Sequence, residues 1–292
     1  MTAVLTRIEE KNQVLAFIHI RKTAGSTVDM ILRQSYCARH CRVRHGKARA
    51  VAPVIAADEL RRCRWVYWGM RSVAGHGIVP HSDLEASYPD IRYFTFLRDP
   101  LARCASDYQF RVRRGGLQIP FDVWIQTEVA RNQQTKKIAA AEDADAAIAM
   151  LRHRVGMVGL VERFDESLVL LKKWCADPKL DIRYESKNVS SDSAIKQQLL
   201  NDPKTRAQLA EANREDDRLY RFAADELFAQ NIRRYGDSFE RDVLAFRATN
   251  KPLPVYPRQI FSGLLREFVY KPLAPVLRNK WNVPAGGRNV AA

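Results

Sequence analysis

Residues 17–27, with the sequence FIHIRKTAGST, join an apolar segment to a segment with helical spacing. Residues 14–20 are mostly apolar, which predicts a short buried strand. Apolar residues at Val28, Ile31 and Leu32 predict a helix over residues 27–34. Small residues in the turn let backbone N–H groups approach an anion, and the start of the helix adds unpaired donors. This order of strand, turn and helix indicates an α/β domain with a candidate phosphate-binding turn.

Polar side chains in this turn suit a phosphate. Lys22 supplies a full positive charge, and Ser26 and Thr27 supply hydroxyl donors. The turn is not the Walker A form GxxxxGK[ST], because its lysine precedes Gly25. From these residues alone, a phosphate-binding turn and an ordinary turn between a strand and a helix are both open interpretations.

Further strands and helices follow along the chain. Strands are predicted over residues 65–70, 91–97 and 156–161, and the last two precede predicted helices over residues 102–111 and 165–175. Strands that alternate with helices favour an α/β fold. We expect a P-loop-like, mostly parallel sheet flanked by helices, with a helical C-terminal part.

The C-terminal third of the chain supports a domain division. Residues 191–234 are helical in pattern, whereas prolines interrupt the chain beyond Lys251, with one short amphipathic helix predicted over residues 260–270. We expect an α/β domain over residues 1–246 and a basic, proline-containing tail over residues 247–292. The tail either packs on the domain or rests on an anionic membrane through its apolar residues.

A second motif, RDPLARCASDY, occupies residues 98–108. Arg98 ends a predicted strand, and open α/β sheets bind ligands at the carboxyl ends of their strands. On the helix that follows, Ser106 shares a face with Arg103. The guanidinium of Arg98 and the hydroxyl of Ser106 can therefore converge on one phosphate. The alternative interpretation is a capped surface helix with an Arg–Asp pair.

The two motifs together resemble those of the PAPS-dependent sulfotransferases, specifically the Golgi-type carbohydrate branch (heparan sulfate 2-O-sulfotransferase-like) and its bacterial relatives. In that family a loop of the form HIPKTxG[ST][ST] holds the 5′-phosphosulfate of PAPS (3′-phosphoadenosine 5′-phosphosulfate), and a segment RDPxxRxxSxY holds its 3′-phosphate. Arg21 departs from the family, which usually has proline there. The resemblance continues, in consistent order, in residues 75–77 (GHG), 132–136 (NQQTK), 158–167 (VGLVERFDES), 188–190 (NVS) and 217–220 (DRLY).

The resemblance implies sulfuryl transfer from PAPS to an acceptor hydroxyl, on a carbohydrate or glycolipid, by in-line displacement. It implies that Lys22 neutralises the leaving group, and that Arg98 and Ser106 hold the 3′-phosphate. The residues that would hold the 5′-phosphosulfate form the first turn: Arg21, Lys22, Thr23, Ala24, Gly25, Ser26 and Thr27.

The acceptor hydroxyl needs a base, and histidine suits this role because it titrates near neutral pH. His76 is the first candidate because it lies in the Gly-His segment, and His81 is the alternative. Glu162 is a third candidate, although a structural ion pair with the neighbouring Arg163 is the favoured interpretation. No metal is expected, since no histidines and cysteines have a zinc-ligand spacing.

Composition sets wider limits. The chain has 292 residues and a formal net charge of +15, which predicts an anionic partner. No window of 18 uncharged apolar residues occurs, and no secretory leader is expected at the N-terminus. Five cysteines at irregular spacing favour reduced thiols and a cytoplasmic location, with membrane association through the tail as an extension of this prediction.

Two rival functions are open. A P-loop kinase or NTPase would need a lysine after the glycine and an acid for magnesium, for which Asp99 is a weak candidate. A basic nucleic-acid-binding protein is favoured by the net charge and by the aromatic residues Trp65, Tyr67 and Trp68 beside basic ones. No recognised binding module occurs, so no nucleic-acid partner is expected.

Overall fold

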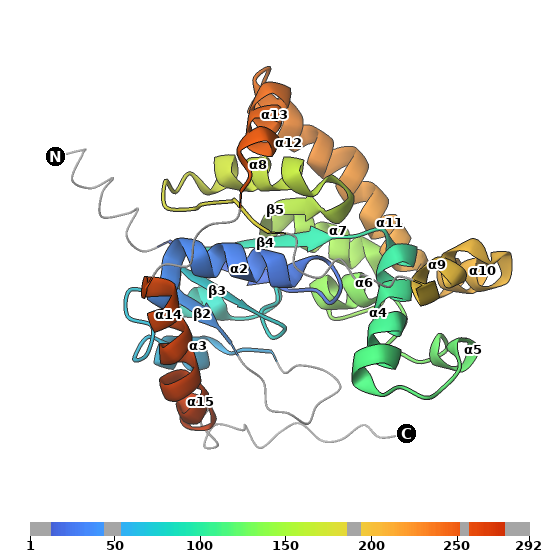
Figure 1. Ribbon diagram of the computed structural model, residues 1–292, viewed down its shortest axis with the longest axis horizontal. Coiled ribbons are helices and arrows are strands. Elements are labelled where there is room, and N and C mark those ends of the chain that lie inside the picture. The colour runs from blue at the N-terminus through green and yellow to red at the C-terminus, as the bar shows by residue number, and fades with distance from the viewer. Residues whose placement is uncertain (1–12, 44–53, 186–193, 252–256, 278–292) are drawn as a thin grey trace.

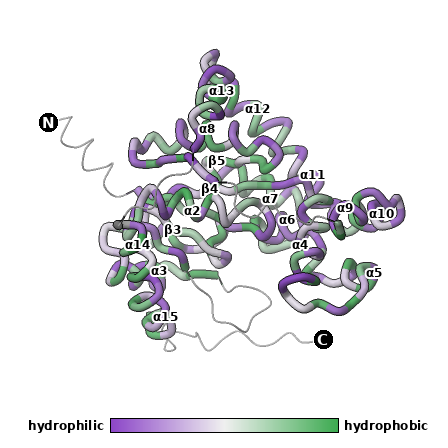
Figure 2. The backbone as a smooth tube through the Cα atoms, viewed as in Figure 1, coloured by the Kyte–Doolittle hydropathy of each residue, from purple (hydrophilic) through white to green (hydrophobic). Residues whose placement is uncertain are grey.

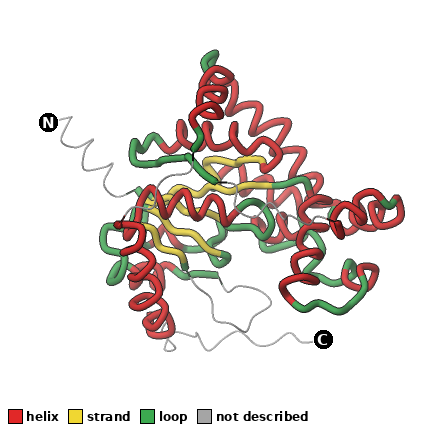
Figure 3. The backbone as a smooth tube through the Cα atoms, viewed as in Figure 1, coloured by secondary structure: helices red, strands yellow, loops and turns green. Residues whose placement is uncertain are grey.

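A computed structural model describes residues 13–43, 54–185, 194–251 and 257–277. Five parallel strands form one sheet in the order β2-β3-β1-β4-β5, surrounded by helices (Figures 1 and 3). The strands are β1 (Val14–Ile18), β2 (His40–Arg42), β3 (Ser72–Gly75), β4 (Ile91–Leu97) and β5 (Val155–Leu160). All four pairings between neighbouring strands are parallel. The predicted α/β fold with a parallel sheet is therefore confirmed.

The central strand shows why the sequence adopts this arrangement. Every residue of β1 is buried, as expected for a strand covered on both faces. The turn after β1 leads into α2 (Gly25–Tyr36), and β4 leads into α4 (Pro100–Gly115). Asp99 caps α4, since its side chain accepts a 2.8 Å hydrogen bond from the backbone N–H of Ala102. The predictions of β1, β4, β5 and the helices after them are confirmed within a few residues.

The helices of the first 185 residues carry both hydrophilic and hydrophobic residues (Figure 2), and most of them contribute buried apolar side chains to the main hydrophobic core, which contains the sheet. Besides α2 and α4 they are α3 (Ala57–Cys63), α5 (Phe121–Trp124), α6 (Gln133–Ala139), α7 (Ala144–His153) and α8 (Phe164–Cys175), with short 3₁₀ turns η1 (Cys37–Arg39), η2 (Leu84–Ala86) and η3 (Val161–Arg163).

The strand predicted over residues 65–70 is wrong. These residues form turns after α3, and the strand of this region begins only at Ser72. Trp65 and Trp68 are exposed, at 79% and 83%, so the aromatic residues that suggested a buried strand mostly face solvent. Gly69 has a φ of +64°, a left-handed conformation that ends extended structure.

The C-terminal part is helical, as predicted. It contains α9 (Ala194–Asn201), α10 (Pro203–Ala212), α11 (Arg214–Phe222), the π-helix η4 (Ala223–Phe228), α12 (Ala229–Tyr235) and α13 (Phe239–Thr249). Because α13 continues past residue 246, the predicted domain boundary falls inside a helix.

The predicted tail contains a longer helical segment than residues 260–270. It runs through α14 (Pro257–Leu264), the π-helix η5 (Leu265–Tyr270) and α15 (Lys271–Leu277). Tyr270, Ala274 and Leu277 are buried in the main hydrophobic core, so one face of the segment packs on the α/β domain.

A smaller hydrophobic core lies beneath α4, where Tyr108 packs against Phe121 and Trp124 of α5. None of the five cysteines, all within the described residues, forms a disulfide. Among the described residues, no helix combines the length and the apolar character needed to cross a membrane.

Candidate functional site

The carboxyl ends of three neighbouring strands bring the predicted segments together. His19 follows β1, His76 follows β3, and Arg98 follows β4. The strand order reverses at β1, which has β3 on one side and β4 on the other, and such a reversal opens a ligand-binding crevice in α/β sheets. The turn after β1 contacts both neighbours: His76 Nδ1 lies 2.9 Å from the carbonyl oxygen of His19, and Arg98 Nη1 donates a 3.1 Å hydrogen bond to the carbonyl of Lys22.

The backbone of the first turn is unusual. Lys22 and Ala24 both have left-handed conformations, with φ of 67° and 58°, which non-glycine residues seldom adopt. Thr23 is buried between them, and its hydroxyl donates a 3.1 Å hydrogen bond to the carbonyl of Ile20. Backbone turns of this kind can form concave groups of N–H donors that bind anions. Strain of this kind occurs preferentially at functional sites.

Gly25 begins α2 directly against the imidazole of His19. A Cβ atom at this position would lie 2.0 Å from the ring, so only glycine fits. His19 is 8% exposed, and its ring contacts those of Phe17 and His76, at centroid distances of 5.5 Å and 4.3 Å. Gly25 therefore permits close packing of the helix start against His19.

Of the two cations predicted in the first turn, Lys22 has no described ion-pair partner. Burial lowers the pKa of its amine. Asp107 raises this pKa, whereas the nearby charges of Arg98, Arg21 and Arg114 lower it further. Its Nζ lies 4.6 Å from the centre of the Phe110 ring, and no carboxylate is described within ion-pair distance of it. An anionic ligand would relieve the repulsion among these positive charges.

Arg21, predicted in the candidate phosphate-binding turn, has a partner on α4. Its guanidinium pairs with the buried carboxylate of Asp107 at 3.2 Å, and Asp107 also pairs with Arg111 at 3.0 Å. These arginines hold the pKa of Asp107 below its usual value, against the effect of burial. Arg21 thus links the turn to α4.

The backbone of Arg98 is held by the side chain of Gln134. Gln134 accepts a 2.9 Å hydrogen bond from the N–H of Arg98 and donates another of 2.9 Å to its carbonyl. The Nε of Arg98 is buried without a hydrogen bond, 4.0 Å from Glu162 Oε1, and burial lowers the pKa of the guanidinium. The predicted partner Ser106 is half-buried on α4. The unused donor of Arg98 suits a ligand oxygen.

A buried network of α6 and α11 positions Gln134. The carboxylate of Asp216 accepts hydrogen bonds from the backbone N–H groups of Gln134 and Thr135, at 3.1 and 2.7 Å. Asn132 in turn accepts from the N–H groups that begin α11. The fully buried Arg103 lies 3.8 Å from Asp216, so the two ions compensate each other. The segment 132–136 thus has a structural role, which is to hold Gln134 in place.

The two candidate bases are held alike but differ in position. His76 Nδ1 lies on the carbonyl of His19 and His81 Nδ1 lies 3.2 Å from the carbonyl of Ile138. A carbonyl can only accept, so Nδ1 of each ring is assigned as the donor and Nε2 as the free acceptor. Of the two, only His76 is shown in ring contact with His19, at a centroid distance of 4.3 Å, and so adjoins the candidate phosphate-binding turn. Burial lowers the pKa of His76 to about 4 and that of His19 to about 3.

Two lysines that the sequence did not single out lie close to these groups. Lys137 of α6 donates a hydrogen bond to the carbonyl of His76, and burial lowers its pKa to about 7. Lys196 of α9 is close enough to Arg98 that the guanidinium helps to lower its pKa, after burial. Lys137 directly follows the segment NQQTK of residues 132–136, which was an available signal, whereas nothing near Lys196 in the sequence marks it.

The carboxylates near Arg98 have structural partners. Glu162 accepts hydrogen bonds from the N–H of Asp99 and from the hydroxyl of Tyr220, at 3.1 and 2.8 Å. The expected ion pair between Glu162 and Arg163 is wrong, because Arg163 pairs with Glu166 instead.

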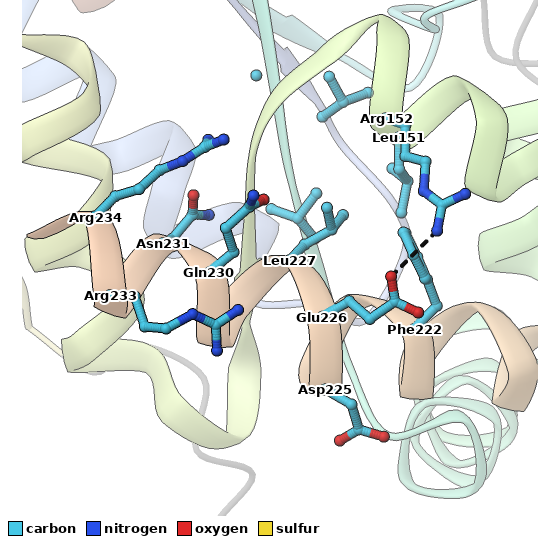
Figure 4. A pocket seen from close by; sticks show the side chains of 13 residues that line it. Leu151, Arg152, Phe222, Asp225, Glu226, Leu227, Gln230, Asn231, Arg233 and Arg234 are labelled. Atoms are coloured by element: carbon cyan, nitrogen blue, oxygen red, sulfur yellow. Dashed lines mark hydrogen bonds and ion pairs between the residues drawn. The ribbon is translucent and has the colours of Figure 1, made fainter.

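A cavity of about 580 Å³ lies away from these residues, between α7, the start of β5 and the helical segment η4–α12 (Figure 4). Its lining includes Arg233 and Arg234, as well as Arg152, which pairs with Glu226 at 3.1 Å. None of the predicted site residues lines it. Within the described ranges, no three His, Cys, Asp or Glu side chains are grouped to hold a metal ion.

Comparison with known proteins adds no name to this site. No protein-family model matches the chain, and no curated protein sequence matches it significantly.

Proposed function

We propose that this protein is a PAPS-dependent sulfotransferase that acts on a hydroxyl of a carbohydrate or glycolipid. The observation that supports the proposal most is the meeting of three groups at one edge of the sheet: the turn of Lys22, Arg98 and His76. Sulfuryl transfer requires a turn that binds the phosphosulfate, a second cation and a neutral imidazole as base, held close together.

The available donors suit a ligand with two anionic groups. Lys22 and the N–H groups of its turn would bind the 5′-phosphosulfate. Arg98, with its unbonded Nε, would bind the 3′-phosphate together with Ser106 and with Lys196 from α9. The segment 188–190, which resembles a further part of the family pattern, lies outside the described residues. A separate position for the 3′-phosphate, beside that for the 5′-phosphosulfate, would let the protein distinguish PAPS from ATP.

His76 would act as the base. In the proposed reaction the bond between sulfur and the bridging phosphate oxygen breaks, and a bond between sulfur and the acceptor oxygen forms. The acceptor proton passes to Nε2 of His76, and adenosine 3′,5′-bisphosphate leaves. Because burial holds the imidazole neutral at pH 7, Nε2 is available to accept a proton. A neighbouring phosphosulfate would raise the pKa of His76, because its negative charge favours the imidazolium.

The kinase alternative has less support. Asp99, the candidate magnesium ligand, uses its carboxylate to cap α4. The lysine of the turn also precedes Gly25, unlike the Walker lysine.

Isothermal titration calorimetry with adenosine 3′,5′-bisphosphate tests the proposal, with 5′-AMP and ATP as comparison ligands. We expect binding that requires the 3′-phosphate and falls at least about tenfold in Arg98→Ala, because a charge-assisted contact is lost. Arg241→Ala is the matched control, since that arginine is exposed on α13. Equal binding of all three nucleotides, or none in a folded sample, would contradict the proposal.

Transfer itself is measured with PAPS and a panel of glycans and glycolipids. His76→Ala should abolish transfer while bisphosphate binding persists, and His81→Ala should retain transfer. A fully active His76→Ala variant would remove His76 from the mechanism.

A further inference from the structure

The helical segment α14–η5–α15 presents an exposed apolar face. Six of its apolar residues are between 41% and 74% exposed, and we call them the apolar stripe: Ile260, Phe261, Leu264, Phe268, Leu273 and Val276. Contiguous exposed apolar side chains of this size are uncommon on soluble proteins and mark interaction surfaces.

The opposite face of the segment already holds it to the domain. Tyr270 stacks edge-on against Tyr67 at 5.3 Å, and Leu277 accepts a hydrogen bond from Arg62 of α3. Ser262 and Ala274 are also buried. The segment lies beside α3 at one edge of the molecule (Figure 1). The apolar stripe is therefore not needed for packing on the domain.

Two exposed tryptophans lie in the turn after α3, close in sequence to the contact between Tyr67 and the segment. Trp65 and Trp68 flank Tyr67 in the turn after α3, and Tyr67 contacts the segment through Tyr270. Tryptophan is favoured where a protein meets the headgroup region of a bilayer, because its ring is apolar and its N–H is polar.

Positive charge borders this surface. Arg33 and Arg39 are exposed on α2 and η1, both of which contact α14, and Arg64 is exposed at the end of α3, which contacts α15. Arg61 of α3 is also exposed, but it pairs with Asp58 at 2.8 Å. Glu267, the one acid of residues 257–277, is paired with both Arg266 and Lys271. The formal net charge of the whole chain is +15. A partner of complementary chemistry would therefore have an anionic surface that covers an apolar interior.

We infer that the apolar stripe, with Trp65 and Trp68, docks on the surface of an anionic phospholipid bilayer. An amphipathic helix that lies in the plane of the interface buries its apolar side chains among the acyl chains, while the bordering cations meet the headgroups. A helical face of exposed apolar side chains, with exposed tryptophans and arginines on neighbouring elements, fits this geometry. The inference is independent of the proposed sulfotransferase activity.

Flotation of the full chain with large unilamellar vesicles tests the inference. We expect binding to phosphatidylcholine vesicles that contain phosphatidylglycerol, and little binding to phosphatidylcholine alone. Phe261→Ser/Phe268→Ser should weaken this binding by about tenfold or more for each phenylalanine, because each apolar ring loses its burial. Raising the ionic strength should weaken it further.

Leu244→Ser is the matched control, because Leu244 is 63% exposed on α13 and lies outside the stripe. Circular dichroism and thermal unfolding should show that all variants fold like the parent. Equal binding of the double variant and the control would overturn the inference, as would equal binding to neutral vesicles. A stripe-dependent dimer in sedimentation velocity, without vesicle binding, would also overturn it and assign the surface to a second copy of the chain.

Discussion

Replacing Gly25 by alanine tests the geometry at the centre of the site. The added Cβ would lie 2.0 Å from the His19 ring, whereas carbon atoms in contact are normally about 3.5–4.0 Å apart. Either the ring or the start of α2 must therefore move by about 1.5 Å, the shortfall from an ordinary contact. The ring cannot move freely, because it is buried in contact with the rings of Phe17 and His76.

The size of the effect follows from two opposing contributions. Overpacking of a filled interior costs about 1–3 kcal/mol, and alanine is favoured over glycine in a helix by about 0.5–1 kcal/mol. Gly115→Ala in α4 provides a control at another helix end, since its Cβ would meet only Arg111 Cβ at an ordinary 3.9 Å. The difference in free energy of unfolding between the two variants is expected to be about 1–3 kcal/mol.

Urea unfolding at equilibrium measures this difference, and calorimetry with adenosine 3′,5′-bisphosphate measures its consequence for the site. We expect Gly25→Ala to be the less stable variant and to bind the nucleotide more weakly, because movement of His19 disturbs the turn and the carbonyl that holds His76. A Gly25→Ala protein as stable as Gly115→Ala would refute the close packing of His19 on the helix.

Three further predictions concern the surroundings of the site. Gln134→Leu removes both hydrogen bonds to the backbone of Arg98, so we expect a loss of about 1–3 kcal/mol in urea unfolding and weaker bisphosphate binding; unchanged binding in the folded variant would contradict the role of this clamp. Asp216→Ala leaves the buried Arg103 without its carboxylate and should cost about 3–5 kcal/mol in the same assay, whereas a loss below about 1 kcal/mol would indicate that the pair is unimportant. Lys137 has a pKa of about 7 in the folded state and 10.5 as its ordinary value, so between these pH values the unfolded chain binds a proton that the folded chain does not. Stability should therefore rise with pH over that range, and Lys137→Met should remove this rise and be more stable than the parent at pH 7. If urea unfolding shows the same change in free energy of unfolding between pH 7 and 9 for the parent and the variant, the burial of the amine is contradicted.

The strands that could be predicted from the sequence are those with large apolar side chains. All of β1 and nearly all of β4 are buried, so their residues form apolar runs that are clear in the sequence. By contrast, β3 consists of Ser72, Val73, Ala74 and Gly75, which lack the bulk that marks a strand. The edge strand β2 buries His40, whose side chain contacts Ser72 and Asp29, and such polar burial has no apolar pattern.

The candidate site residues at the strand ends could be singled out from the sequence because each lies within a short local motif. What the motifs could not give is how distant segments meet. Gln134 reaches the backbone of Arg98 from 36 residues away, and Arg21 has its carboxylate partner 86 residues away. The choice between His76 and His81 likewise depends on the stacking of His76 on His19, which only the fold determines.

The contact between Arg98 and the carbonyl of Lys22 couples the two halves of the candidate site. Its Nη1 is bonded to the first turn, whereas its Nε has no hydrogen bond, so one guanidinium connects the turn to the position proposed for the 3′-phosphate. The turn itself is held in left-handed conformations that are intrinsically unfavourable. A ligand that engages Arg98 therefore also fixes the carbonyl of Lys22, and with it the direction of the neighbouring N–H groups. Loss of the 3′-phosphate should accordingly weaken binding by more than one contact, because the turn would lose part of its support.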